Sequence, residues 1–150
     1  MSKIFINGAL GLAINDNRQV FLTQRNEPTD PNFHQKWNIP GGGIEWGETP
    51  EETLVREFRE ELNIVPTIIY PHPITITSIQ GDAHILLLCY IVKIGNQQID
   101  TTVDTAHENM AYGWFSVEEA NKLDSLPQTR ETIAKAFALL ENHDILDKIK

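Results

Sequence analysis

Apolar and polar positions alternate in short runs over the first part of the chain, and this pattern predicts β-strands. Apolar runs at residues 4–6, 9–14 and 20–22 are rich in Ile, Leu, Phe and Ala, and a polar segment at 15–17 separates the last two. Polar turn residues between two apolar runs are typical of a β-hairpin. We therefore expect 9–14 and 20–22 to pair with each other as neighbouring strands.

Further β-rich segments lie in the second half of the chain. Residues 68–79 and 83–94 are dense in Ile, Leu, Thr and Val, as expected of central strands, and a Gly-Asp pair joins them. Another short strand is expected at 112–115. The segment 26–36 contains two prolines and shows little periodicity, so we expect a loop there.

Helix signals begin after a run of glycines at residues 41–43. Thr49 followed by Glu52 fits a capping box, and Pro50 stands at the first helical position. The helix is expected to end near Leu62, where the next residue is an Asn that tolerates the left-handed conformation.

Two more helices are expected towards the C-terminal end. Ser116 and Glu119 form a second capping box, which opens a short helix. A last helix is expected over residues 127–141, with an apolar stripe formed by Ile133, Phe137 and Leu140. The order of strands and helices predicts an α+β sandwich with a mixed sheet, in one domain over residues 1–150.

The charge of the chain limits the partners it can have. Its net charge is −9 at pH 7, from 21 acidic and 12 basic residues. A domain with this charge repels polyanions on average, which argues against binding nucleic acid through a basic face. A phosphorylated small molecule would need divalent cations as a bridge.

Composition also favours a cytoplasmic protein that does not enter a membrane. No apolar run approaches the ~20 residues needed to span a bilayer, and residues 1–5 lack the features of a signal peptide. Cys89 is the one cysteine, so neither an intrachain disulfide nor a Cys-rich metal site is expected. It lies within an apolar run and is interpreted as a core residue.

Three glutamates occupy an unusual position on the helix expected at 50–62. On a helical wheel of about 100° per residue, the apolar stripe consists of Leu54, Val55, Phe58 and Leu62. Glu57, Glu60 and Glu61 lie directly beside this stripe and not opposite it. Carboxylates at this spacing repel each other unless a cation such as Mg²⁺ binds between them. The pattern fits either a solvated acidic face without function or a site for a divalent cation.

The surrounding residues resemble a known family. From Gly42 the chain reads Gly, five residues, Glu48, seven residues, and then R-E-F-R-E-E-L-N-I over 56–64. This resembles the signature of the Nudix hydrolase family, G-x(5)-E-x(7)-R-E-U-x-E-E-x-G-U, where U is a bulky apolar residue. Asn63 stands where the family usually has Gly, and Asn also accepts positive φ. Residues 37–42 and 113–120 resemble the family as well.

The resemblance implies both a fold and an activity. It implies an α/β/α sandwich with a central mixed β-sheet. It implies hydrolysis of a diphosphate linkage in a nucleoside triphosphate, or in another nucleoside diphosphate derivative, by water attack at phosphorus. The implied cofactor is Mg²⁺, with Mn²⁺ as a substitute, and the implied partner is a small-molecule nucleotide.

The resemblance also implies roles for individual residues. Most of them lie within residues 42–64, which are called the box below. The implied metal ligands are Gly41 through its carbonyl, Glu57, Glu60, Glu61 and Glu108. One of the three helical glutamates would accept a proton from the attacking water, and the family does not fix which one. The implied structural residues are Gly42, Glu48 and Arg56, the last two suited to a bidentate ion pair. For Glu108 the alternative is an exposed loop acid without function.

Substrate contacts are implied at two further positions. Arg25 would contact a phosphate, or it is simply a solvated residue at a strand end. Asn38 would contact a purine edge through its amide, or it caps the loop before the glycines. Phe33 and His34 are candidates to stack on the base as the 26–36 loop closes.

Two other functions remain open from the sequence. The same fold can serve as a catalytically inactive nucleotide-binding module, although such modules usually lose box glutamates. It can also serve as a diphosphate isomerase, for which the chain looks short. The identity of the nucleotide, the number of metal ions and the oligomeric state are not fixed by the sequence.

Overall fold

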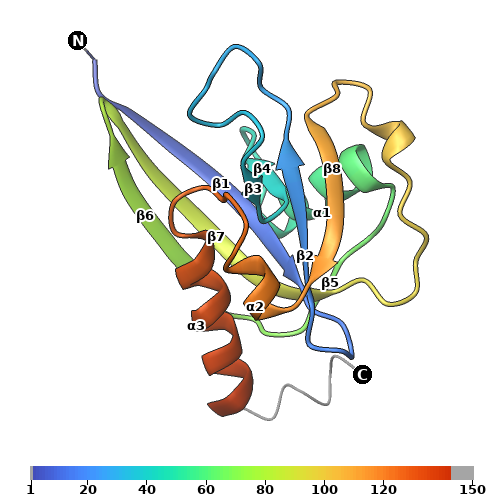
Figure 1. Cartoon of the computed structure of the whole chain (residues 1–150). Coiled ribbons are helices and arrows are strands. Elements are labelled where there is room, and N and C mark those ends of the chain that lie inside the picture. Colours follow the sequence, from blue (N-terminus) through green and yellow to red (C-terminus); the bar gives the residue numbers. More distant parts are fainter. Residues whose placement is uncertain (1, 143–150) are drawn as a thin grey trace.

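Two long parallel strands run through the middle of the computed structural model, which describes residues 2–142 (Figure 1). β1 (Ile4–Ala13) pairs with β7 (Ala83–Lys93) along its whole length. β4 (Gly41–Gly43) pairs antiparallel with the other edge of β1. β5 (Thr67–Ile68) and β6 (Ile74–Gln80) pair antiparallel with β7. The five strands form the mixed sheet that the sequence predicts.

A smaller antiparallel sheet stands beside the first. Its middle strand is β2 (Val20–Arg25), flanked by β3 (Trp37–Asn38) and β8 (Asn109–Phe115). β8 begins at Asn109 and is longer than the strand expected at 112–115, because its first residues pair with the end of β2 across a bulge. The connection between β2 and β3 is the expected loop.

The hairpin expected between residues 9–14 and 20–22 is not formed. β1 and β2 belong to different sheets, and within residues 2–142 a single bridge between Ile14 and Val20 joins them. β7 pairs with one edge of β1 along its whole length and β4 pairs with the other edge at Gly8–Leu10, whereas β2 pairs with β3 and β8. The turn at 15–17 still forms, because the Asn15 side chain accepts hydrogen bonds from nearby backbone N–H groups.

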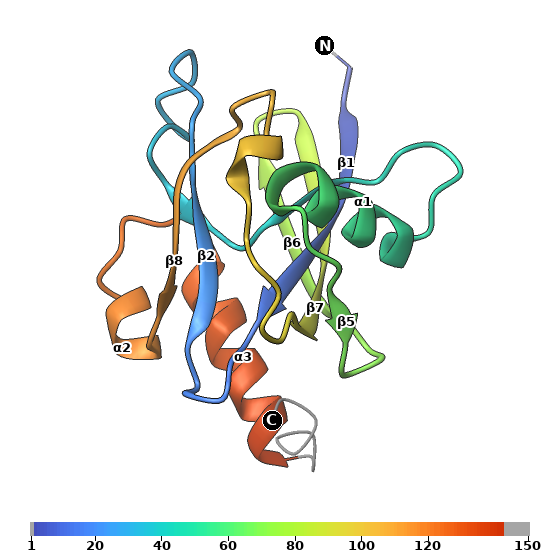
Figure 2. The same ribbon diagram turned by 90° about the vertical axis from the view of Figure 1, so that its right-hand side faces the viewer.

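Helices cover opposite faces of the large sheet (Figure 2). α1 (Pro50–Leu62) lies on one face, and α3 (Thr129–Asn142) lies on the other. The short α2 (Val117–Ala120) follows β8, and a 3-10 helix, η1 (Thr101–Val103), lies between β7 and β8. The arrangement confirms the α/β/α sandwich.

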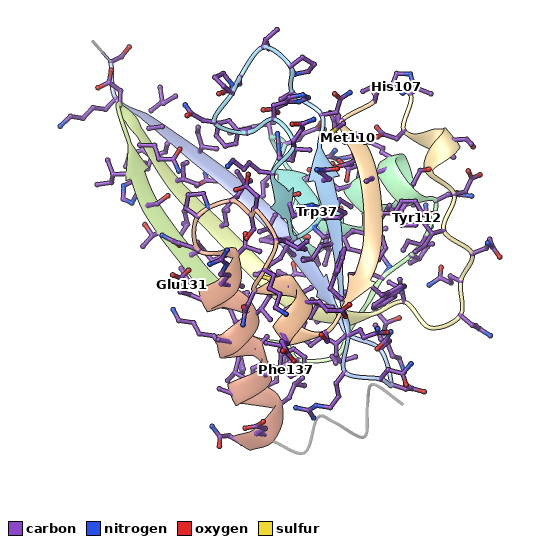
Figure 3. The ribbon with its side chains drawn as sticks, in the orientation of Figure 1. Trp37, His107, Met110, Tyr112, Glu131 and Phe137 are labelled. Carbon is purple, nitrogen blue, oxygen red and sulfur yellow. The ribbon has the colours of Figure 1, made fainter. Side chains whose placement is uncertain are left out.

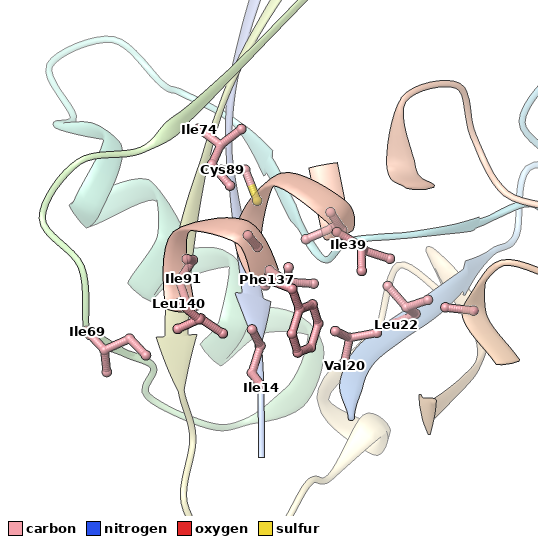
Figure 4. Close-up of a cluster of buried hydrophobic side chains, with 14 residues drawn as sticks. Ile14, Val20, Leu22, Ile39, Ile69, Ile74, Cys89, Ile91, Phe137 and Leu140 are labelled. Carbon is pink, nitrogen blue, oxygen red and sulfur yellow. The ribbon is translucent and has the colours of Figure 1, made fainter. Parts of the chain in front are cut away.

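Alternating residues of the central strands build two separate cores. On the α3 side, residues such as Cys89 and Ile91 pack with Phe137 and Leu140 (Figure 4). On the α1 side the core consists of Ala13, Phe21, Leu54, Phe58, Leu62, Ile64, Tyr90, Val92 and Ile94. Successive residues of β7 therefore face different helices, as expected of a strand buried on both faces.

Local interactions fix both ends of α1 where the sequence predicts them. Thr49 Oγ1 accepts a hydrogen bond from the Glu52 N–H at 3.1 Å, and Glu52 Oε1 accepts one from the Thr49 N–H at 3.0 Å. At the other end Asn63 has φ 55° and donates its N–H to the Arg59 carbonyl. The capping box and the left-handed cap are both confirmed.

Other boundaries differ from the expected ones by a few residues. α3 begins at Thr129 and not at 127, and its stripe of Ile133, Phe137 and Leu140 is buried as predicted. Residues 69–73 are not part of a strand. Among the described residues no helix combines the length and the apolar character needed to cross a membrane.

Candidate active site

Two glutamates of α1 lie on the side of the helix that packs against the rest of the protein. Glu57 is 9% exposed and Glu61 is 6% exposed, although both carry carboxylates. Glu108, in the loop before β8, lies beside them, and one carboxylate oxygen of each residue lies within 4.8 Å of the other two. We call these three residues the acidic centre. It joins two residues from the box to one that is nearly fifty positions away.

Glu60 lies outside the acidic centre. Its side chain is 59% exposed, and one of its oxygens lies 3.4 Å from Arg56 Nη1. The structure thus brings Glu57 and Glu61 together with Glu108 but does not bring Glu60 into the same group. A role for Glu60 as a metal ligand stays a prediction.

The glycines before α1 allow the helix to approach the sheet. A Cβ atom on Gly42 would lie 2.4 Å from the carboxylate carbon of Glu57, so any side chain there would displace Glu57. Gly41 has φ 149°, and a Cβ on it would lie 2.1 Å from the Ala9 carbonyl oxygen. Gly42 therefore lets the Glu57 carboxylate lie directly against the backbone of β4. The Gly41 carbonyl stays a predicted ligand.

A bidentate ion pair ties the loop before α1 to the helix. Arg56 Nε lies 2.7 Å from Glu48 Oε2, and Arg56 Nη2 lies 3.0 Å from Glu48 Oε1. Arg56 also donates to the Gly43 carbonyl and, from Nη1, to Glu57 Oε1 at 2.9 Å. Hydrogen bonds from Arg56 lower the pKa of Glu48 to about 2. Arg56 thereby connects the loop, β4 and the acidic centre.

Burial makes the acidic centre electrostatically unfavourable without a cation. Burial raises the pKa of Glu57, although Arg56 opposes the shift. Burial also raises the pKa of Glu61, with the neighbouring carboxylates of Glu108 and Glu57 adding to the effect. Three converging carboxylates supply hard oxygen ligands of the kind that divalent cations such as Mg²⁺ bind. The donor set therefore fits a divalent cation.

Two neighbouring cavities share part of their lining, and the acidic centre lines one of them. The first, of about 310 Å³, is lined by Glu57, Glu61 and Glu108 together with mainly polar residues, and we call it the polar cavity. The second, of about 280 Å³, is lined largely by aliphatic side chains of β1, β6 and β7 and by the start of α3, and we call it the apolar cavity. The residues common to both linings are Arg25, Asn38, Gly41, Gly42 and Gly43.

The predicted substrate-binding residues lie where the two cavities meet. Arg25 pairs with Glu27, and its guanidinium carbon lies 5.6 Å from the centre of the Phe33 ring. Asn38 Oδ1 accepts a hydrogen bond from Thr23 Oγ1 at 3.1 Å. Phe33 lines the apolar cavity, whereas His34 is not among the residues that line either cavity, and its Nδ1 accepts the Glu27 N–H.

Two residues that hold the Glu108 loop were not singled out from the sequence. Asp104 accepts hydrogen bonds from the backbone of this loop, and Asn26 binds it from the side of β2. Figure 3 shows His107 and Met110 at the end of the molecule where the loop enters β8. For Asp104 a signal was available, because Asp side chains often accept backbone N–H groups a few residues further on.

The fold and the site together define a class: an α+β enzyme whose carboxylate centre suits a divalent cation and lines a cavity of about 310 Å³. The sequence model of the NUDIX domain matches residues 5–137. The 8-oxo-dGTP diphosphatase of Escherichia coli (strain K12) is 32% identical over 142 residues, which cover 90% of this chain and 97% of that relative. The chain therefore belongs to the Nudix hydrolase family and is a pyrophosphohydrolase of nucleotide derivatives.

Solved structures show the same architecture. The solution structure of the Escherichia coli ORF135 protein superposes with a TM-score of 0.76 at 25% identity, over 94% of both chains. A MutT NUDIX hydrolase from Burkholderia pseudomallei superposes with a TM-score of 0.72 at 20% identity, over 88% of this chain and 98% of that one. The second likeness bears on the fold alone. Members of this family generally use a divalent metal, in agreement with the acidic centre.

Proposed function

We propose that this protein is a Mg²⁺-dependent enzyme that hydrolyses a nucleoside triphosphate or a related nucleoside diphosphate derivative by water attack at phosphorus. The observation that carries the proposal is the convergence of Glu57, Glu61 and Glu108 within 4.8 Å at the wall of the polar cavity. Two buried acids beside a third carboxylate would be a costly arrangement without a function. When the same acids bind a cation, their charges are neutralised and the arrangement is no longer costly.

The metal would be held by the acidic centre, with Glu60 and the Gly41 carbonyl as further candidate ligands. A bound Mg²⁺, or Mn²⁺ in its place, supplies charge neutralisation at the diphosphate and at the leaving oxygens. Gly42 and Arg56 fix Glu57 from two sides, so its carboxylate is positioned before any ligand arrives.

The chain's own residues then divide the remaining work. One of Glu57, Glu60 and Glu61 accepts the proton of the attacking water. Arg25 offers a cation at the junction of the two cavities, and its Nε is buried without a protein partner. A phosphate oxygen is a suitable acceptor for that N–H.

The apolar cavity suits the nucleoside. Its aliphatic walls favour a flat base, and the Phe33 ring stands at its edge. The Asn38 amide lies between this cavity and the acidic centre, with its oxygen already bonded to Thr23. The relative from Escherichia coli, which matches over 97% of its length, is named an 8-oxo-dGTP diphosphatase, so an oxidised guanine triphosphate is the first substrate to test.

The alternative of a catalytically inactive binding module lacks support. All the glutamates of the box are present, and two of them lie with Glu108 in one group. A binding module would need no such group of acids beside a nucleotide cavity.

The test uses Glu57→Gln and Glu61→Gln in a phosphate-release screen over about twenty nucleotides with Mg²⁺, with inorganic pyrophosphatase added so that released pyrophosphate is also detected as phosphate. Each variant should lose roughly 10²-fold or more in kcat/KM, because a ligand or a base is removed. Glu118→Gln, an exposed acid of α2, is the matched control and should keep full activity. Wild-type turnover in both Gln variants would remove the assignment, and tight nucleotide binding without product would favour the binding module.

A further inference from the structure

We propose that Asp104 is a positioning residue, whose carboxylate holds the backbone of Glu108 so that the Glu108 side chain stays in the acidic centre. The inference rests on the proposed function, because it assumes that the acidic centre binds a divalent cation. It assigns a task to a buried acid that neither the box nor the family resemblance covers.

The backbone of Glu108 needs hydrogen bonds from other parts of the chain to stay in place. It lies in a segment between η1 and β8 that is neither helix nor strand, and it is exposed. Its carboxylate lies within 4.8 Å of those of Glu57 and Glu61, whose ionised forms repel it when no cation is bound. A loop residue under such repulsion would swing outwards unless its backbone were fixed. Glu57 and Glu61, in contrast, are fixed by the helix.

Asp104 fixes the N–H side of this backbone. Its Oδ1 accepts a hydrogen bond from the Glu108 N–H at 3.3 Å, and its Oδ2 accepts one from the Asn109 N–H at 3.1 Å. The Asp104 carbonyl accepts the His107 N–H at 3.0 Å. Both carboxylate oxygens therefore bind successive backbone groups around the Glu108 Cα atom. Charge-assisted bonds of this kind are stronger than neutral ones.

Asn26 fixes the carbonyl side. The Asn26 N–H donates to the Glu108 carbonyl at 2.9 Å, and Asn26 Nδ2 donates to the His107 carbonyl at 2.8 Å. Asn26 directly follows Arg25, the last residue of β2. The main chain of Glu108 is thus held from both sides, between the η1 segment and the end of the strand that leads to the substrate cavities.

Asp104 acts through Glu108 and not as a ligand itself. It is not part of the acidic centre and does not line the polar cavity. It is 7% exposed, and among residues 2–142 no ion pair to it is found within 4.0 Å. An unpaired buried acid near Glu61 is unfavourable. A neutral Asn could close the same turn, but it offers one acceptor oxygen where the carboxylate offers two.

The experiment is a double-mutant cycle between Asp104→Ala and Glu108→Gln, read by calorimetric titration of metal-free protein with Mn²⁺ and by kinetics. Asp104→Ala should weaken Mn²⁺ binding roughly tenfold, as is typical when a residue that orients a ligand is lost. It should lower kcat more than it raises KM. In the Glu108→Gln background the same substitution should cause no further loss.

Two more variants complete the design. Asp104→Asn keeps one acceptor and should lie between wild type and Asp104→Ala, and it carries the test if the Ala variant does not fold. Asp100→Ala is the matched control, since Asp100 is a half-buried acid of the same segment that binds the Thr102 N–H and has no hydrogen bond to Glu108. It should behave as wild type. Hydrogen exchange at the Glu108 and Asn109 amides should accelerate in the Asp104 variants and not in Asp100→Ala.

The outcomes separate this inference from the proposed function. Equal losses from Asp104→Ala in the wild-type and Glu108→Gln backgrounds would overturn it, because Asp104 would then act independently of Glu108. Wild-type Mn²⁺ affinity in Glu108→Gln would overturn it too. In both cases an activity loss in Glu57→Gln and Glu61→Gln would leave the proposed function intact.

Discussion

α1 and α3 are two amphipathic helices on opposite faces of one sheet, but they differ in the burial of their acidic side chains. Each buries an apolar stripe, with Phe58 at the centre of one and Phe137 at the centre of the other. α3 keeps its first-turn acid, Glu131, exposed at the surface (Figure 3). α1 instead places Glu57 and Glu61 at the buried edge of its stripe. Among its described residues α3 buries no acid, whereas α1 combines its packing stripe with two buried acids of the candidate site, at a cost in stability.

The largest expected difference is in the effect of removing one negative charge from each helix. Glu61→Gln should lower kcat/KM by roughly 10²-fold or more. It should also raise the free energy of unfolding of the metal-free protein at pH 8 by about 1–2 kcal/mol, since a buried carboxylate with a raised pKa is removed. Glu131→Gln should change neither quantity. Urea denaturation in EDTA, together with turnover in Mg²⁺, measures both.

A stability loss in Glu61→Gln without metal would contradict the comparison between the helices. It would mean that the Glu61 carboxylate makes favourable contacts in the metal-free fold, and that its burial on α1 does not lower stability.

The next contrast concerns truncation of the two apolar stripes. Leu54 of α1 is 0% exposed and Ile133 of α3 is 1% exposed. Leu54→Ala and Ile133→Ala should each lower the free energy of unfolding by about 2–5 kcal/mol. Only Leu54→Ala should also lower the turnover of the molecules that remain folded, because it loosens the helix that carries Glu57 and Glu61. Denaturation curves and kinetics at a temperature below both transitions check this, and equal turnover in the two variants would contradict it.

The sequence predicted α1 well because local interactions determine it. The capping box of Thr49 and Glu52 and the left-handed cap at Asn63 involve residues within one turn of each other. The spacing of the glutamates follows from helix geometry alone. Prediction of Glu108 as a neighbour needed the family resemblance, since nothing local relates it to the box.

Strand pairing could not be predicted in the same way. The pattern around residues 4–14 predicts β-strand but does not identify its partner, so the predicted hairpin with 20–22 was wrong. The two apolar runs at 4–6 and 9–14 belong to one continuous strand, in which Gly8 permits close approach to β7: a Cβ there would lie 2.8 Å from the Leu87 side chain. Asp104 was not predicted from the sequence, for a similar reason. Its burial and its two backbone contacts arise from the fold of a loop.

A smaller effect is expected from pH. The pKa values of Glu57 and Glu61 are raised in the folded metal-free protein. Above pH 4.5 these groups therefore keep protons in the folded state that they have lost in the unfolded chain. Stability from this source is complete below pH 4.5 and is lost as pH rises, whereas a bound cation removes the penalty. Glu48, with its pKa lowered to about 2, acts in the opposite direction, because its stabilisation is present above pH 4.5 and is lost only as pH falls below that value.

The Mg²⁺-induced increase in Tm should therefore be larger at pH 8 than at pH 5.5, by roughly 3–6 °C. Thermal unfolding with Mg²⁺ and with EDTA at both pH values measures it. Ile133→Ala serves as the control on the α3 side and should show the same Mg²⁺ effect from a lower baseline. A pH-independent increase would show that the buried acids of α1 do not set the stability of the metal-free state.

The smallest effect concerns the end of α1, where the family signature has Gly and this chain has Asn63. Asn63 is exposed and adopts φ 55°, which Asn tolerates and most other residues do not. Asn63→Gly should change the free energy of unfolding by less than about 0.5 kcal/mol, because relief of the left-handed conformation is offset by the greater freedom of the unfolded chain. Asn63→Ala should lose about 1 kcal/mol. Both variants should keep the kcat/KM of wild type, since the cap does not touch the acidic centre. A clear loss of turnover in Asn63→Gly would show that the end of α1, and not only its buried edge, takes part in positioning Glu61.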